Sequence, residues 1–80
     1  RVFRAFDHRL TPAETAALAL SPRHRRVLRE LLAGRSEKQV AQDLALSRHT
    51  IHEYEKGLYA HLAVSSRAEL LALFLQRAAV

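Results

Sequence analysis

The side chains best suited to chemistry lie along a predicted helix at residues 48–62. Ile51, Leu58 and Leu62 align on one side of this helix, because successive residues turn by about 100°. The opposite side is polar, and its side chains are of kinds that reach base edges or phosphates in DNA, although an ordinary solvated helix face has the same character. The polar positions are His49, Glu53 and Lys56, with Arg48 and His52 beside them.

The start of the same helix suits a second kind of contact. Ser47 and Thr50 lie at its N-terminus, where their hydroxyls and the unpaired backbone amides can bind phosphate.

Other chemistries find less support in the sequence. Asp7 and His8 form a local pair with no nucleophile placed beside it, and no glycine-rich loop is present to cradle phosphate. His49 and His52 are three residues apart and could bridge a metal, but the acid nearest to them, Glu53, lies on the same exposed face, and exposed helix histidines are usually solvated. We therefore expect no enzyme activity, no metal site and no cofactor.

Helices must position these side chains, and their starts carry recognisable signals. Thr11 and Ser21 each precede a proline, the pattern of a capped helix that begins with proline. Ser36 and Gln39 have the spacing of a capping box. No segment alternates in the manner of a strand. The sequence predicts an all-α fold with helices at about 12–19, 22–33, 37–44, 48–62 and 67–78.

A short turn joins two of these helices. Ala45-Leu46-Ser47 separates 37–44 from 48–62, and a turn of this length holds two helices at a steep angle and can present the second to a major groove. Ala41 is small where the two helices would cross. Periodicity predicts a core of Val27, Leu28, Leu31, Leu32, Val40, Leu44, Leu46, Ile51, Leu58, Leu62, Val64, Leu70 and Phe74.

The composition favours an anionic partner. The formal net charge is +5, and arginine supplies eleven of the thirteen positive residues, a side chain whose planar fork suits phosphate. There is no cysteine, which excludes disulfides and thiolate metal sites. The most apolar run, Leu70 to Leu75, is too short to span a bilayer, so we expect no membrane partner. The chain begins at Arg1, which indicates a processed chain or a fragment, and residues 1–10 have the spacing of a short amphipathic helix.

Four segments, in the right order, resemble the LuxR/GerE-type helix-turn-helix family of bacterial transcription regulators. The match is continuous from Leu20 to about Leu73, which makes it far more specific than a lone helix-turn-helix. The segments resemble the family's opening (LSPRHRRVL, 20–28), its scaffold-helix start (GRSEKQVA, 34–41), its recognition helix (SRHTIH, 47–52) and the entry to its last helix (LAVSSRAEL, 62–70).

The resemblance implies a four-helix DNA-binding domain at 21–80, preceded by an N-terminal helical extension or linker at 1–20. It implies sequence-specific binding of double-stranded DNA in the cytoplasm, as the output domain of a regulator, with helix 48–62 in the major groove. It also implies a homodimer through the last helix, with an upstream sensor domain and RNA polymerase as candidate further partners.

Carried over by position, the resemblance assigns base contacts to His52, Glu53 and Lys56, and phosphate contacts to Lys38 and Thr50. The last helix has an apolar arc too wide for one small core to bury, which leaves an edge for a partner. The expected site is Arg48, His49, His52, Glu53 and Lys56 for bases, Lys38, Ser47 and Thr50 for phosphate, and Leu71, Leu73 and Leu75 for dimerisation.

The chain departs from the family at several positions. Ala45 and Ala63 replace turn glycines, where a left-handed backbone strains alanine. Glu55 replaces an apolar residue near the core edge, so its charge needs a partner, for which arginine is the candidate. Gly57 costs about 1 kcal/mol against alanine inside a helix. His52 replaces a lysine, and Tyr54 and His61 replace a histidine and a lysine.

These departures leave other functions open. Across 48–62, Arg48 and Lys56 balance Glu53 and Glu55, so the formal charge is zero, and most of the positive charge lies at 23–35 instead. A protein-interaction module that has lost DNA binding is therefore one alternative. A sigma-factor-like promoter-reading domain is another, against which the segment 64–70 argues.

Overall fold

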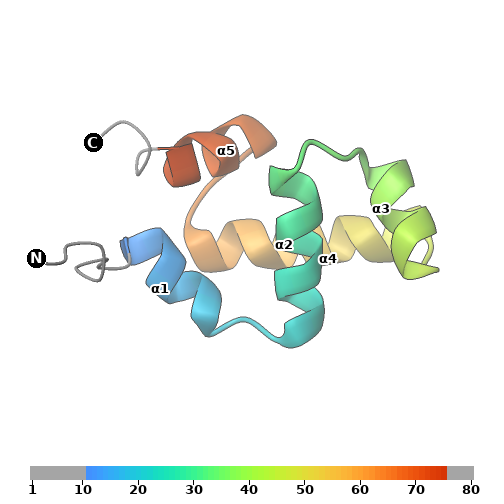
Figure 1. Ribbon diagram of the computed structural model, residues 1–80, viewed down its shortest axis with the longest axis horizontal. Coiled ribbons are helices and arrows are strands. Elements are labelled where there is room, and N and C mark those ends of the chain that lie inside the picture. Colours follow the sequence, from blue (N-terminus) through green and yellow to red (C-terminus); the bar gives the residue numbers. More distant parts are fainter. Residues whose placement is uncertain (1–10, 76–80) are drawn as a thin grey trace, which may run out of the picture.

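The all-α prediction is confirmed. The computed structural model describes residues 11–75, which form five α-helices and no strand (Figure 1). The predictions for residues 1–10 and for the end of the last helix beyond Leu75 lie outside the described residues. The helices are α1 (Pro12–Leu18), α2 (Pro22–Leu32), α3 (Glu37–Leu44), α4 (Arg48–Leu62) and α5 (Arg67–Leu75).

The helices begin where the side chains at their N-termini bind the unpaired backbone amides. The Thr11 hydroxyl accepts a hydrogen bond from the amide of Glu14 at 3.1 Å, and the Glu14 carboxylate accepts one from the amide of Thr11 at 2.9 Å. Ser36 and Gln39 make the same reciprocal pair at the start of α3. Each pair satisfies two amides that the first turn of a helix leaves unpaired.

α4 is the longest helix and makes its main contacts with three others. It packs against α2, α3 and α1, and α1 also contacts α5. Figure 1 shows α2 running across α4, with α3 beside the start of α4 and α1 and α5 gathered toward its end. The Ala16 carbonyl lies 2.8 Å from Nε2 of His61, which fastens α1 to the last turn of α4. The domain boundary predicted at residue 20 stays a prediction. α1, which precedes that boundary, packs against α4 and α5.

The core forms around the apolar side of α4. Ile51 and Leu58 are fully buried, and Leu62 lies among the same side chains. Burying a leucine or isoleucine side chain stabilises a fold by about 1.5–3 kcal/mol, so this cluster is the main source of stability in so small a domain. The buried cluster is Val27, Leu28, Leu31, Val40, Ala41, Ile51, Leu58, Leu62 and Leu70, and Leu32, Leu44, Leu46, Val64 and Phe74 of the predicted core are half-buried against it.

Two helices end on alanine in the left-handed conformation, as the sequence predicted. Ala45 has a φ of 57° and Ala63 a φ of 58°. A residue with a Cβ pays about 1–2 kcal/mol in this region. The core therefore holds both turns closed against local strain. Gly34, with a φ of 89°, follows α2 without that cost.

No single helix within residues 11–75 is long and apolar enough to cross a membrane. Only the bent pair α4 and α5, taken together, meets the length and composition of a span.

We expect Gly→Ala substitutions at the two glycines to change the free energy of unfolding in opposite directions. Gly57 lies inside α4, and a Cβ there would stand 3.4 Å from Nε2 of His24, an ordinary contact distance. Gly57→Ala should therefore raise the free energy of unfolding by about 1 kcal/mol, because alanine favours a helix interior. Gly34→Ala should lower it by about 1 kcal/mol, because of its positive φ. Urea denaturation monitored by circular dichroism measures both, and a destabilised Gly57→Ala would contradict the explanation.

Candidate nucleic-acid interface

The turn between α3 and α4 is short because Ala45 reverses the direction of the chain. The amide of Leu46 donates to the Ala41 carbonyl at 2.9 Å, which closes the end of α3. Ser47 then begins α4, and its Oγ accepts a hydrogen bond from the amide of Thr50 at 3.0 Å. Ala41 is buried beneath the turn, as expected of a small residue where two helices cross closely. These contacts form a helix-turn-helix pair.

The five side chains predicted to contact bases all lie exposed on α4. They are Arg48, His49, His52, Glu53 and Lys56. Nζ of Lys56 lies 3.4 Å from Oε2 of Glu53, and more than half of each side chain is exposed. An ion pair this exposed is worth little, so either group can exchange its partner for one on DNA.

The residues predicted to bind phosphate lie at the starts of the two helices. Oγ of Ser47 lies 2.9 Å from Oγ1 of Thr50, which places both hydroxyls at the N-terminus of α4. Lys38 is exposed on the first turn of α3. Its neighbour Glu37 contacts His52, so the start of α3 lies beside the second turn of α4. The assignments of these residues to bases and phosphates stay predictions.

A cluster of three titratable groups joins α3 to α4. Nδ1 of His52 lies 3.1 Å from Oε2 of Glu37 and 3.9 Å from Oε1 of Glu55. One potential ligand atom from each of the three groups lies within 4.8 Å of the other two, a separation that one cation could bridge. Of the three, Glu55 is almost completely buried and His52 is exposed. The cluster was not predicted, because Glu37 is 15 residues from His52 in the chain.

The partner predicted for Glu55 was wrong. The hydroxyl of Tyr59 donates to Oε2 of Glu55 at 3.3 Å, and Glu37 and His52 complete its surroundings. No arginine bonds to it within residues 11–75. Burial, together with the neighbouring Glu37, raises the pKa of Glu55 to about 7. A hydrogen bond from the protonated Glu55, with another from His52, lowers the pKa of Glu37. A proton shared between Glu55 and Glu37 therefore allows the Glu55 carboxyl to be buried without a neighbouring cation.

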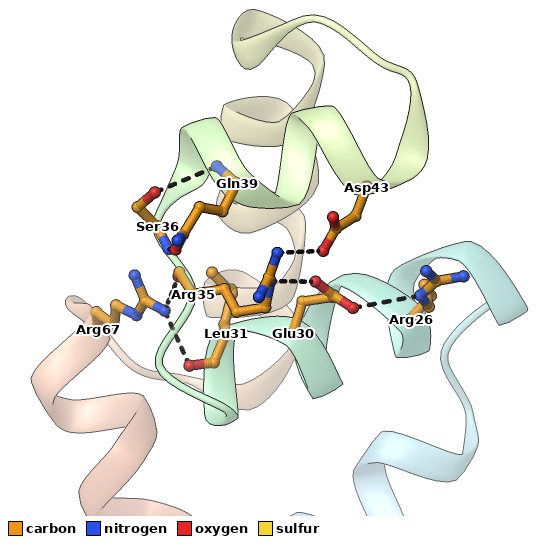
Figure 2. A network of polar contacts seen from close by, with 8 residues as sticks. All are labelled: Arg26, Glu30, Leu31, Arg35, Ser36, Gln39, Asp43 and Arg67. Atoms are coloured by element: carbon orange, nitrogen blue, oxygen red, sulfur yellow. Dashed lines mark hydrogen bonds and ion pairs between the residues drawn. The ribbon is translucent and has the colours of Figure 1, made fainter.

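Part of the positive charge at 23–35 is used within the fold. Arg35 lies between two acids, with Nε 3.0 Å from Oε1 of Glu30 and Nη2 2.7 Å from Oδ2 of Asp43 (Figure 2). Arg26 also reaches Glu30, at 3.6 Å. Arg35 therefore ties the end of α2 to α3 and is not available as a DNA contact of full charge.

A second arginine fastens α5 to the same region. Nη2 of Arg67 donates to the carbonyl of Leu31 at 2.9 Å and also to the carbonyl of Arg35 (Figure 2). The Leu31 carbonyl belongs to the last turn of α2, where it also accepts from the amide of Gly34 at 3.0 Å, and the Arg35 carbonyl follows the end of the helix. Sequence reasoning missed this role, because Arg67 is separated from its acceptors by 36 and 32 residues. The only signal was its place in the family-like segment 62–70.

The rings of His24 and Tyr54 pack against each other between α2 and α4. Oγ of Ser21 lies 2.6 Å from Nδ1 of His24, and the His24 ring meets Tyr54 edge-on at 4.6 Å between centroids. Such a contact adds about 0.5–1.5 kcal/mol beyond the buried area. It fixes the first turn of α2 over the middle of α4.

The last helix leaves part of its apolar surface uncovered. Leu70 is fully buried, Leu71 and Leu73 are half-buried, and Leu75 is 64% exposed. The arc predicted to exceed the core therefore does so within the described residues. Its use in dimerisation stays a prediction.

The fold and the helix pair define a helix-turn-helix domain, and comparison with known proteins assigns this domain to a family. The family model "Bacterial regulatory proteins, luxR family" matches residues 18–74. The chain belongs to this family, which is one of DNA-binding transcription regulators and not of enzymes. The resemblance deduced from the sequence is thus confirmed.

Two curated relatives agree with this assignment. The chain is 32% identical over 65 residues to "Probable HTH-type transcriptional regulator GfsR" of Streptomyces halstedii, covering 81% of this chain and 27% of that protein. It is 36% identical over 55 residues to "Transcriptional regulatory protein FixJ" of Bradyrhizobium diazoefficiens, covering 69% of this chain and 27% of that protein. The chain thus spans about a quarter of the length of either relative. No solved structure matches it.

The raised pKa of Glu55 predicts how stability depends on pH. The unfolded carboxyl has an ordinary pKa of 4.5, so between 4.5 and about 7 the unfolded chain releases a proton that the fold retains. Stability from this group is therefore complete below 4.5 and is lost as the pH rises through 7. Glu55→Gln, which mimics the protonated form, should raise the free energy of unfolding at pH 8 by about 1–3 kcal/mol and change it little at pH 5.

Urea denaturation at the two pH values measures the effect. Glu53→Gln is the matched control, because it removes the same charge from an exposed position of α4. Equal effects of the two substitutions at pH 8 would contradict the account of Glu55.

Proposed function

We propose that this domain binds double-stranded DNA in a sequence-specific manner, as the output domain of a bacterial transcription regulator. The observation that carries the proposal is that α4, in a chain of the luxR family, has one buried apolar side and one exposed polar side. Its apolar side is buried under the neighbouring helices, and its polar side faces outward with Arg48, His49, Glu53 and Lys56 exposed. An exposed polar helix of this kind fits the major groove of DNA.

His52 is expected to contact DNA through one nitrogen. Glu37 lies against Nδ1, which leaves Nε2 for a base edge or a phosphate. The carboxylate of Glu37 on α3 thus orients the ring of His52. His52 therefore differs from the flexible lysine usual at this position, because its reach is shorter and its direction is set.

The residues proposed to bind phosphate lie beside the exposed polar side of α4. Ser47 and Thr50 place hydroxyls at the N-terminus of α4, where unpaired amides and the helix dipole favour an anion. Lys38 adds a charge at the start of α3. Together they would set the depth of α4 in the groove, whereas the base contacts would choose the sequence.

The proposal includes a dimer formed through α5. Leu71, Leu73 and Leu75 offer the uncovered apolar edge, and a two-fold pair would present two copies of α4 to half-sites about one helical turn apart. A bacterial regulator of this kind would act in the cytoplasm. An upstream sensor domain and RNA polymerase are proposed as further partners of the longer protein.

Selection of bound DNA from a random double-stranded pool tests the function directly. We expect enrichment of one short motif, occurring as paired half-sites with a fixed spacing. A pool that shows no enrichment would overturn DNA recognition and favour the protein-interaction alternative. Enrichment of single, unpaired half-sites would keep the DNA function and reject the dimer.

Lys56 and Lys38 should lose different properties when changed to alanine. Lys56 lies on the outward side of α4, so Lys56→Ala should cost about 1–3 kcal/mol on the selected site and relax one base position. Lys38→Ala should weaken binding to all sequences alike and lower the slope of log affinity against log salt by about one. Fluorescence anisotropy over a salt series measures both. If the two variants gave the same specificity profile, the division of roles would be wrong.

A further inference from the structure

Three side chains that can ligate a metal ion meet where the start of α3 lies beside α4 (Figure 1). Glu37 belongs to the first turn of α3, and His52 and Glu55 are three residues apart on α4, a spacing that places both on one side of the helix. The turn at Ala45 brings the two helices together, so Glu37 meets a residue 15 positions further along the chain. We call these three side chains the α3–α4 cluster.

The distances within the α3–α4 cluster suit a shared ion. Nδ1 of His52 lies 3.1 Å from Oε2 of Glu37 and 3.9 Å from Oε1 of Glu55, and one atom from each residue lies within 4.8 Å of the other two. A zinc ion about 2.0–2.2 Å from each ligand places two ligand atoms about 3.3 Å apart in a tetrahedral site. The first distance already fits, and the second requires a movement of about half an ångström, which the exposed side chain of His52 can make.

The α3–α4 cluster brings two carboxylates together without an adjoining lysine or arginine. Only 6% of the Glu55 side chain is exposed, whereas the side chains of Glu37 and His52 are 30% and 56% exposed. Within residues 11–75, neither carboxylate forms an ion pair with a lysine or an arginine, although the charge of Arg48 acts on Glu37. A shared proton neutralises one of the two carboxylates. A divalent cation would neutralise both and release that proton to water.

We propose that Glu37, His52 and Glu55 bind a divalent transition-metal ion of the zinc type. An imidazole nitrogen with two carboxylate oxygens is a ligand set that zinc accepts, whereas Mg²⁺ and Ca²⁺ prefer oxygen ligands alone. Three protein ligands leave the fourth tetrahedral position for a water molecule. The sequence analysis weighed His49 with His52 for a metal and could not place Glu37, which only the fold brings to the site.

A zinc titration of the 80-residue chain tests the site. The chain carries isotope-labelled histidine, is kept at pH 8 in a buffer that does not chelate metals, and is followed by NMR. We expect one equivalent of zinc to saturate the change, with the Nδ1 resonance of His52 shifting while Nε2 of the same ring keeps a proton. Mg²⁺ at the same concentration should cause no change. A His52 ring that does not respond to zinc, or that responds equally to Mg²⁺, would overturn the proposal and leave an ordinary hydrogen-bonded pair.

Matched substitutions test the individual ligands, and isothermal titration calorimetry measures their zinc affinities. His52→Gln and Glu37→Gln should each lower the affinity at least about tenfold, since even a residue that only orients a metal ligand is worth about that much. His49→Gln removes an exposed histidine from the same helix outside the cluster, so it should leave the affinity within about twofold. Equal losses at His49 and His52 would indicate adventitious binding by exposed histidines and would overturn the site. An unchanged affinity of Glu37→Gln would do the same.

Thermal denaturation gives a readout that does not depend on the histidine resonances. A zinc ion held by residues of both α3 and α4 binds the folded chain, so it should raise the midpoint of thermal unfolding in a saturable way. The rise should be much smaller in His52→Gln than in His49→Gln. An equal rise in the two variants would place the ion elsewhere and overturn the proposal. Because these measurements use no DNA, the metal site and the proposed DNA recognition can each fail without the other.

Discussion

The burial of one side of α4 is the constraint on which the rest of the structure depends. Ile51, Leu58 and Leu62 can leave water only if the neighbouring helices cover them, and that cover decides which side chains of α4 remain outside. The strained turns at Ala45 and Ala63 persist because the helices they join are held in this core. The proposed DNA-binding face is thus a consequence of core packing, with no need for a dedicated binding loop.

The helices were predictable because their signals are local. Caps at Thr11, Ser21 and Ser36 mark starts that the structure shares within a residue, and the apolar periodicity of α4 predicts its buried side. Even the strain at Ala45 could be foreseen, because the resemblance identified a turn where glycine is usual. Local rules suffice where a helix, a cap or a turn involves neighbours along the chain.

The contacts between distant residues were not predictable in the same way. Arg67 reaches carbonyls more than 30 residues away, and no periodicity or spacing connects them. Glu55 was recognised as out of place, but an arginine was expected where Glu37, His52 and Tyr59 are found. Counting charges along the chain also overstated what is available, since Arg35 is neutralised by Glu30 and Asp43. Net charge describes composition, whereas its distribution over the surface depends on packing.

The contact of Arg67 with the carbonyls of Leu31 and Arg35 has a mechanical consequence. It couples α5 to the end of α2, and Arg35 in turn couples that point to α3 (Figure 2). The start of the last helix is therefore fastened to the helix-turn-helix by side-chain contacts. In a pair joined through α5, these contacts would help to set the separation and angle of the two reading helices, so an added base pair between half-sites would have to be accommodated by twisting the DNA.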